Sequence, residues 1–261
     1  MSRTNSSLPD LSGTVALITG GDGGIGSGLV RRFAEAGASV VIHHLSDNAQ
    51  ARDLAAEIES AGGSAATARG DIRDLDQCRT IVAAAVEAFG RLDALVNNAG
   101  VQPLQALQTM SVADWEAVVA VNLTGTFAMT RAAAEVMATH GGGSVTHIAS
   151  VEASLPAPNH AHYAASKAAV KMHARAAALE LGPHGIRVNS VSPGLIDRGN
   201  LAPEWPLGHE TWLRAAPLRR TGTPQDIADA CIFLASPMAS WVSGHDLVVD
   251  GAMSTVPAWG W

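Results

Sequence analysis

The chain's single tyrosine, Tyr163, stands four residues before Lys167, and Lys167 is one of two lysines among 261 residues. Residues 162–181 are rich in alanine and free of glycine and proline, which favours a helix with positions i and i+4 on one face. A phenol ionises near pH ~10, and a neighbouring cation favours its anion. The pair therefore indicates a general acid/base. A packed tyrosine beside a solvated lysine has the same spacing, so the remaining motifs must decide.

A glycine-rich segment at residues 19–26 follows an apolar run and leads into a helical pattern. Glycines let a backbone turn tightly and approach a pyrophosphate, whose charge is met by the N–H groups at a helix N-terminus. A flexible loop is the alternative for such a segment alone, but its place between a strand and a helix favours a dinucleotide site. The expected contacts are Gly20, Asp22, Gly24, Ile25 and Gly26.

Short β-branched runs alternate with longer helical patterns along the chain. The runs are residues 14–19, 39–44, 65–69, 92–97, 144–149, 187–192 and 246–249, and the helical patterns are residues 25–36, 49–61, 75–89, 112–138, 163–181 and 224–234. Several runs are apolar on both faces, as parallel strands covered by helices must be. We expect an α/β fold: one doubly wound Rossmann-type domain with a seven-stranded parallel sheet and helices on both faces.

Within this fold we expect residues 1–10 to be a flexible N-terminal segment and residues 11–261 to form a single catalytic domain. The stretch 195–217 is too long for an ordinary connection and carries Trp205 and Trp212. Long insertions in compact domains are usually binding loops, so we interpret it as a substrate-binding lid. Helix ends are predicted at Gly37 and Gly62, and N-caps at Asp47 and Thr223.

Composition narrows the class of partner. The net charge is −7 and the pI is near 5.7, and basic residues never run longer than two, which argues against nucleic acid and anionic membranes. Neither an N-terminal apolar leader nor a membrane-length apolar span occurs, so we expect a cytoplasmic protein. Cys78 and Cys231 are expected as buried thiols rather than a disulfide. His160 and His162 lack a third ligand nearby, so we expect no metal.

Further motifs follow in a fixed order. They are Asn97-Asn98-Ala99-Gly100, Asn122, Ser150 thirteen residues before Tyr163, and Pro193-Gly194. Together with the glycine loop and the Tyr/Lys pair, they make residues 11–253 resemble the short-chain dehydrogenase/reductase family. The closest likeness is to its branch of glucose 1-dehydrogenases and 3-oxoacyl-thioester reductases. The resemblance implies an NAD(P)-dependent oxidoreductase that interconverts a ketone and a secondary alcohol by hydride transfer.

The resemblance also implies residue roles. Tyr163 would be the general acid/base, and Lys167 would lower its pKa and hold the nicotinamide ribose. Ser150 would hydrogen-bond the reacting oxygen, and Asn122 would kink a helix and hold a water of a proton relay. The alternatives from the residues alone are a turn-forming serine and a helix-bending asparagine.

For the cofactor, the resemblance implies three groups of contacts. Asp71 and Ile72 would contact adenine, Asn98, Ala99 and Gly100 would lie beneath the adenine-side ribose, and Pro193, Gly194 and Ile196 would border the nicotinamide. Arg198 departs from the family, which often has threonine there, so it would reach a cofactor phosphate or the lid.

Cofactor choice depends on the end of the second strand. His44 and Ser46 can donate to a 2′-phosphate, whereas Asp47 can bond ribose hydroxyls or cap the next helix. Gly23 argues the other way, because NADP-using relatives often carry Arg or Lys at its position. We expect NADP over NAD.

By position, Gln102, Glu152, His160 and Trp205 should border the substrate, although each also fits a surface residue. Apolar lid residues favour a largely apolar substrate. The alternatives are a 3-oxoacyl-[acyl-carrier-protein] reductase, a sugar 1-dehydrogenase and, in another class, a non-catalytic dinucleotide-binding sensor. The family resemblance implies a homotetramer, and Trp259 and Trp261 would either anchor an interface or lie in a disordered tail.

Overall fold

A seven-stranded parallel sheet forms the centre of the protein, in the order β3-β2-β1-β4-β5-β6-β7. The structure is a computed structural model and describes residues 8–46 and 49–257. The strands are β1 Val15–Ile18, β2 Ser39–His44, β3 Ala65–Arg69, β4 Ala94–Asn97, β5 Gly143–Ile148, β6 Ile186–Pro193 and β7 Asp246–Val249. The predicted doubly wound α/β fold is confirmed.

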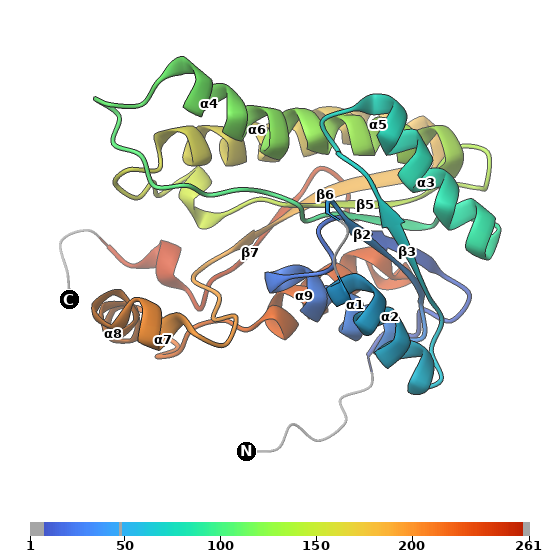
Figure 1. The fold of residues 1–261 in the computed structure, drawn as a ribbon, viewed down its shortest axis with the longest axis horizontal. Helices are drawn as coiled ribbons and strands as arrows, with labels where there is room; N and C mark the ends of the chain where they lie inside the picture. The colour runs from blue at the N-terminus through green and yellow to red at the C-terminus, as the bar shows by residue number, and fades with distance from the viewer. Residues whose placement is uncertain (1–7, 47–48, 258–261) are drawn as a thin grey trace.

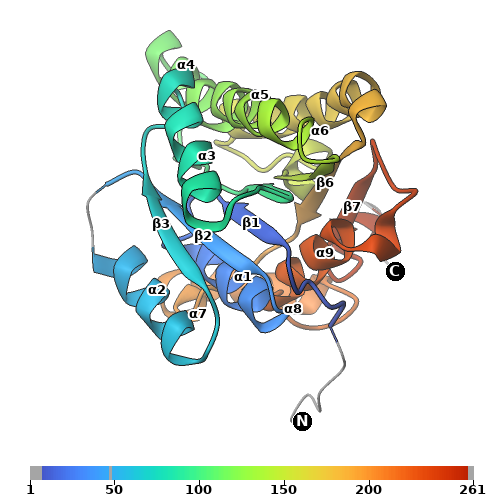
Figure 2. The ribbon, with the colours of Figure 1, turned by 90° about the vertical axis from the view of Figure 1, so that its right-hand side faces the viewer.

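Helices cover both faces of the sheet (Figure 1). On one face lie α1 Gly24–Glu35, α2 Ala49–Ser60 and α9 Pro224–Ala235, and on the other lie α3 Leu75–Phe89, α4 Val112–Val119, α5 Thr126–Met137 and α6 Ala161–Leu181. Figure 2 shows the same two layers from the side. Because side chains alternate along a strand, Ala16 and Ile18 join the core under α1 and α9, whereas Val15 and Leu17 join the core under α3 and α5.

Helix boundaries follow the local chemistry expected of them. Thr223 caps α9 in a reciprocal capping box with Asp226, and Pro224 occupies the first turn. Gly37 and Gly62 have φ values of +92° and +87°, the left-handed conformation that commonly ends a helix. Asp47, the other expected cap, lies outside the described residues.

One expectation about helices needs correction. The pattern at residues 112–138 is not one α-helix, because a π-helical segment, η1 Ala120–Gly125, separates α4 from α5. The stretch 195–217, which we interpret as a lid, contains α7 Leu201–Glu204 and α8 Pro206–Ala215. Pro206 ends any continuous helical pattern there and begins α8. Four short 3-10 helices complete the described elements: η2 Val151–Ala153, η3 Gly182–His184, η4 Pro237–Ala239 and η5 Met253–Thr255.

The strand order reverses between β1 and β4, since β1 continues to β2 on one side while β4 lies on the other. In doubly wound sheets, ligands bind outside the carboxyl ends of the strands at such a switch point. Across the described residues, every helix is too short or too polar to span a membrane. Cys78 and Cys231 are buried free thiols.

Candidate active site

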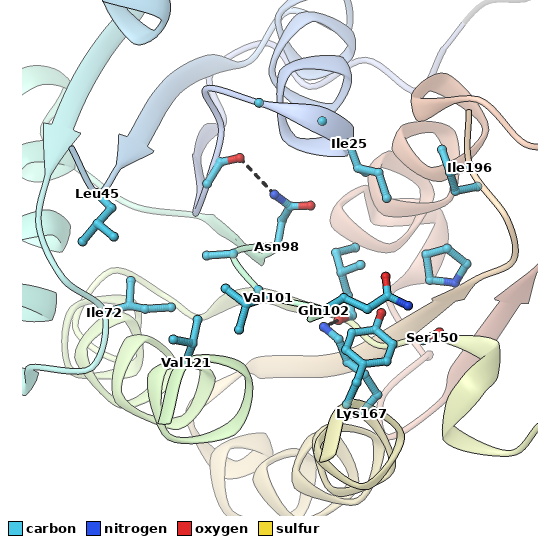
Figure 3. A pocket seen from close by; sticks show the side chains of 18 of the residues that line it. Ile25, Leu45, Ile72, Asn98, Val101, Gln102, Val121, Ser150, Lys167 and Ile196 are labelled. Carbon is cyan, nitrogen blue, oxygen red and sulfur yellow. Dashed lines mark hydrogen bonds between the residues drawn. The ribbon is translucent and has the colours of Figure 1, made fainter. Parts of the chain in front are cut away.

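A cleft of about 800 Å³ opens at this switch point, bordered by the loop before α1, by the ends of several strands and by α6. Figure 3 shows its length, with Leu45 and Ile72 at one end and Gln102, Ser150 and Lys167 at the other. Many of the cofactor contacts expected from the sequence line it: Gly20, Asp22, Gly24, Ile25, Ser46, Asp71, Ile72, Asn98, Ala99, Gly100, Tyr163, Lys167, Pro193, Gly194 and Ile196.

The glycine loop is held in a conformation that suits a phosphate. Gly20 and Gly24 have φ values of +60° and +53°, which other residues rarely adopt. Gly23 at the N-cap of α1 supplies no side-chain cap, so the first N–H groups of the helix lack that partner. Such a helix start attracts anions. These residues therefore fit the diphosphate of a dinucleotide.

Asn98 and Thr19 fasten this loop to the end of β4. Asn98 Nδ2 donates to the carbonyls of Thr19 and Gly20 at 2.9 and 3.1 Å, and a bond from its amide is drawn dashed in Figure 3. In return, Thr19 Oγ1 accepts from the backbone N–H groups of Asn98 and Ala99 at 2.9 and 3.0 Å. Asn98 thus shapes the loop in addition to lining the cleft.

Two expected cofactor contacts, Gly26 and His44, are not among the residues that line the cleft. A Cβ on Gly26 would lie 1.9 Å from the Gly20 carbonyl oxygen, so this glycine allows α1 to pack on the loop. The His44 ring is buried and its Nδ1 donates to the Ser46 carbonyl at 2.7 Å, which braces the turn that carries Ser46. Both residues act on the cleft through a neighbour.

His43, which the sequence analysis missed, does line the cleft. Its Nδ1 accepts from the Gly20 N–H at 3.1 Å, and its Nε2 donates to the Gly70 carbonyl at 3.0 Å. Burial lowers its pKa, which favours the neutral ring that this donor–acceptor pattern requires. Alternation along β2 was the available signal, because His43 and His44 point to opposite faces of the sheet.

At the other end of the cleft, α6 presents Tyr163 and Lys167 one turn apart, and Ser150 follows β5. Ser150 is hydrogen-bonded to the Tyr163 phenol. Lys167 is buried, its Nζ lies 5.7 Å from the centre of the Tyr163 ring, and it donates to the Ile148 carbonyl at 2.7 Å. A hydroxyl, a phenol and an amine are thereby gathered on one wall.

The pKa values differ from the sequence expectation for a physical reason. Burial raises the pKa of Tyr163 to about 12, while the Ser150 hydrogen bond opposes the rise. Burial also lowers the pKa of Lys167 to about 8. Lys167 is not among the groups that lower the phenol pKa, since an amine with a pKa of about 8 is neutral in the range where a buried phenol ionises.

Asn122 does not line the cleft but supports it from the π-helical segment. It is fully buried, its Oδ1 accepts from the Val101 N–H at 2.8 Å, and its Nδ2 donates to the Val101 carbonyl at 3.0 Å and to Ser166 Oγ at 3.1 Å. A Cβ on Gly100 would lie 3.2 Å from Asn122 Oδ1 and 3.5 Å from Lys167 Nζ. Asn122 therefore fixes the segment after β4 close to the lysine.

Glu152 contacts two other residues that were expected to border the substrate. Its carboxylate accepts from Gln102 Nε2 at 2.9 Å and pairs with His160 Nδ1 at 2.8 Å. The His160 ring meets the Tyr163 ring edge-on, with ring centres 5.9 Å apart. Of these residues only Gln102 and Tyr163 line the cleft, so Glu152 and His160 act on it through those two side chains.

Trp205 is not among the residues that line the cleft. Its ring packs on Gly208 between α7 and α8, and 55% of the residue is exposed. From the expected lid, Leu201 reaches the cleft instead. Leu195, at the start of the expected lid, lines the cleft as well, and the sequence analysis missed further lining residues that neighbour its motifs: Leu45, Arg73, Val101 and Val121.

The described residues hold no cluster of three or more metal-ligating side chains. His162 accepts from the Tyr163 N–H at 2.9 Å through Nδ1, and His160 is engaged by Glu152. Each of the two imidazoles therefore already has a hydrogen-bond partner within the fold.

A cleft at the switch point of a doubly wound sheet, with a serine, a tyrosine and a lysine at one end, is typical of a nicotinamide-dependent oxidoreductase. Residues 20–254 match the sequence profile of a family described as enoyl-(acyl carrier protein) reductase. The chain belongs to the short-chain dehydrogenase/reductase family. It is an NAD(P)-dependent enzyme that acts on CH–OH and C=O groups.

The names of this chain's relatives refer to varied substrates. It is 40% identical over 244 residues to the 2,5-dichloro-2,5-cyclohexadiene-1,4-diol dehydrogenase LinX of Sphingobium indicum, over 94% of this chain and 97% of that protein. A 7α-hydroxysteroid dehydrogenase solved with NADH and 7-oxo glycochenodeoxycholic acid has TM-score 0.89 and 38% identity, covering 95% of this chain and 97% of its own. A gluconate 5-dehydrogenase of Burkholderia cenocepacia, solved with NADP and tartrate, has TM-score 0.89 and 34% identity, covering 95% and 98%.

Proposed function

We propose that Tyr163 is the general acid/base of the interconversion between a secondary alcohol and a ketone. The bound nicotinamide would supply or accept the hydride. The observation that carries this proposal is the Ser150–Tyr163 hydrogen bond on the cleft wall, one helical turn from the buried Lys167. Ser150 would hold the substrate oxygen next to the phenol, and Lys167 would favour the phenolate once its amine is protonated. Asn122 would keep the segment above Lys167 in place.

We propose NADP as the preferred cofactor. Support comes from the end of β2, where residues 43–46 include no carboxylate that would repel a 2′-phosphate. Ser46 lines the cleft there, with Arg73 close to the same end. Arg73 is paired with Asp71, so its charge is partly committed. One structural relative was solved with NADH and another with NADP, so the preference is argued from the residues of this chain.

The proposed substrate is an alicyclic secondary alcohol with a second hydroxyl group. Val101, Leu195 and Leu201 give the cleft apolar walls, which suit a ring. Because an ionised Glu152 can only accept, Gln102 must turn its NH₂ toward it and its carbonyl away. That carbonyl would accept a hydrogen bond from a substrate hydroxyl. The names of the relatives, which include a cyclic diol dehydrogenase and a hydroxysteroid dehydrogenase, agree with this class.

The rival reading as an acyl-carrier reductase needs a basic docking patch near the lid. Arg214 is paired with Glu210 and Arg220 with Asp226, so much of that charge is offset. The non-catalytic sensor has no use for the Ser150, Tyr163 and Lys167 arrangement. Neither alternative is favoured by a specific contact.

We also propose a cytoplasmic homotetramer. A tetramer with two kinds of twofold interface needs two self-complementary surfaces. Exposed apolar side chains occur over the helical layer at Trp115, Phe127 and Met172, and around β7 at Trp241 and Val248. Light scattering with size-exclusion chromatography would measure the mass, and a monomer at micromolar concentration would contradict the proposal.

The function is tested by following nicotinamide absorbance with a panel of cyclohexanols, cyclohexanediols, sterols and sugars in the presence of NAD or NADP. We expect turnover of alicyclic diols above that of sugars. The Gln102→Met variant should lose about tenfold in kcat/KM for the best diol but little for its matched mono-alcohol, because one hydrogen bond is removed. Gln105→Met, which alters an amide bonded to Thr109 outside the cleft, is the control. Turnover of sugars alone would overturn the substrate class.

A further inference from the structure

Arg198 follows β6 and faces the glycine loop across the cleft. It lines the cleft, and a Cβ on Gly24 would lie 3.1 Å from its Cδ and 3.4 Å from its Nη1. Its side chain therefore lies directly against the start of α1. The residue is solvent-exposed, and within residues 8–46 and 49–257 no hydrogen bond or ion pair occupies its guanidinium.

The backbone beneath Arg198 is anchored on both sides. Ile196 forms a parallel bridge with Gly222, and the Asp197 N–H donates to the Gly222 carbonyl at 2.9 Å. The Asp197 carboxylate then accepts from the N–H groups of Gly199 and Leu201 at 2.8 and 3.2 Å. A fixed base lets the long side chain reach the loop without ordering the backbone first.

Other cations of the cleft are committed elsewhere. Lys167 donates to the Ile148 carbonyl, and Arg73 forms an ion pair with Asp71. Arg198 thus brings an uncommitted positive charge to the uncapped start of α1, at the middle of the cleft. Two sources of positive potential that meet at one point favour an anion there.

We propose that Arg198 binds the diphosphate of the dinucleotide and so ties the expected lid to the glycine loop. The planar guanidinium can donate two parallel hydrogen bonds to phosphate oxygens. This assignment rests on the proposed cofactor cleft. Arg198 stands where the family often has threonine, so the proposed contact belongs to a residue particular to this chain.

The contact has a consequence for the lid. Leu201, at the start of α7, lines the cleft three residues after Arg198. A diphosphate that holds Arg198 therefore holds the first turn of α7 as well. Cofactor binding should then order the apolar wall before the substrate enters.

The test compares ligands with and without the diphosphate. ADP-ribose and adenosine compete with NADH, and displacement is read from NADH fluorescence in the wild type, Arg198→Met and Arg198→Lys. We expect Arg198→Met to weaken ADP-ribose by about tenfold or more and adenosine by less than about twofold, with partial recovery in Arg198→Lys. Raising the salt concentration should weaken ADP-ribose less in Arg198→Met than in the wild type.

Arg214→Met is the matched control, because it removes a lid arginine that pairs with Glu210 outside the cleft. It should leave both affinities unchanged. If the wild type and Arg198→Met bind ADP-ribose equally, the assignment of Arg198 is wrong while the cofactor cleft stands. If adenosine weakens as much as ADP-ribose, Arg198 acts on the cleft shape and the assignment is again wrong. If the wild type binds no ADP-ribose, the proposed cofactor cleft itself is wrong.

Discussion

Lys167 Nζ lies 5.7 Å from the centre of the Tyr163 ring, and it directs its hydrogen bond to the Ile148 carbonyl rather than to the phenol. The two side chains share one helical face, yet the amine acts on the phenol only through space. Because both groups are buried, their neutral forms are favoured, and the pKa values of about 12 and about 8 move in opposite directions. Protonation of Lys167 would therefore lower the pKa of Tyr163 and favour the phenolate.

Replacing Tyr163 by phenylalanine should lower kcat by about 10²-fold or more, because the substrate oxygen loses its proton partner. Cofactor affinity should stay within a few fold. The measurement combines steady-state kinetics with NADH or NADPH fluorescence titration. Near-normal turnover in Tyr163→Phe would show that another group moves the proton.

Ultraviolet difference titration reports one phenol in this chain, because Tyr163 is the only tyrosine. We expect ionisation near pH 12 in the protein alone, above the free value of ~10, and at a lower pH when oxidised cofactor adds positive charge. The Lys167→Met substitution should raise the pKa of Tyr163 in that complex again. Tryptophan absorbance is subtracted with Tyr163→Phe. A titration at the free value in the protein alone would contradict the burial described above.

Stability should rise with pH through the range that Lys167 controls. Its folded pKa of about 8 lies below the ordinary value of 10.5, so the unfolded chain binds more protons between these pH values. The free energy of unfolding should therefore increase by on the order of 2 kcal/mol from pH 8 to pH 10, relative to Lys167→Met. Urea unfolding at several pH values measures the difference. Parallel curves for the two proteins would mean that the lysine is solvated.

Gly26→Ala should destabilise the protein by about 2 kcal/mol, because the added methyl group would meet the Gly20 carbonyl oxygen at 1.9 Å. Gly23→Ala is the matched control in the same loop, since nothing lies within 4 Å of its Cβ position. Its free energy of unfolding should change by less than about 0.5 kcal/mol. Equal losses in the two variants would refute the packing role of Gly26.

Ser46→Asp should shift the ratio of kcat/KM for NADP and NAD toward NAD by about tenfold or more, because a carboxylate repels a 2′-phosphate and accepts from ribose hydroxyls. His44→Asp should act differently. That side chain is buried beneath the turn, so its loss should lower stability more than it alters cofactor choice. A larger shift from His44→Asp than from Ser46→Asp would reverse this assignment.

Much of the sheet could be predicted, because each strand has a local signature. Strands β2, β3 and β7 begin and end where the sequence pattern placed them, since buried β-branched runs between turn residues have one strong reading. A kink at Asn122 was expected from the family resemblance, but its π-helical form over Ala120–Gly125 could not be foreseen. The Asn122 side chain bonds to Val101 and Ser166, and those partners come from other elements.

The sequence by itself determined the fold, the family and the residues able to do the chemistry, because motifs such as Tyr163 and Lys167 depend on spacing within one helix. Tertiary structure alone decided which of them meet. It directed His43 into the cleft and His44 beneath a turn, packed Trp205 on Gly208, and brought Arg198 to Gly24. These contacts join segments far apart in the chain or depend on which face of a strand is covered. The periodicity of a local segment predicts neither its contacts with distant segments nor which face of a strand is covered.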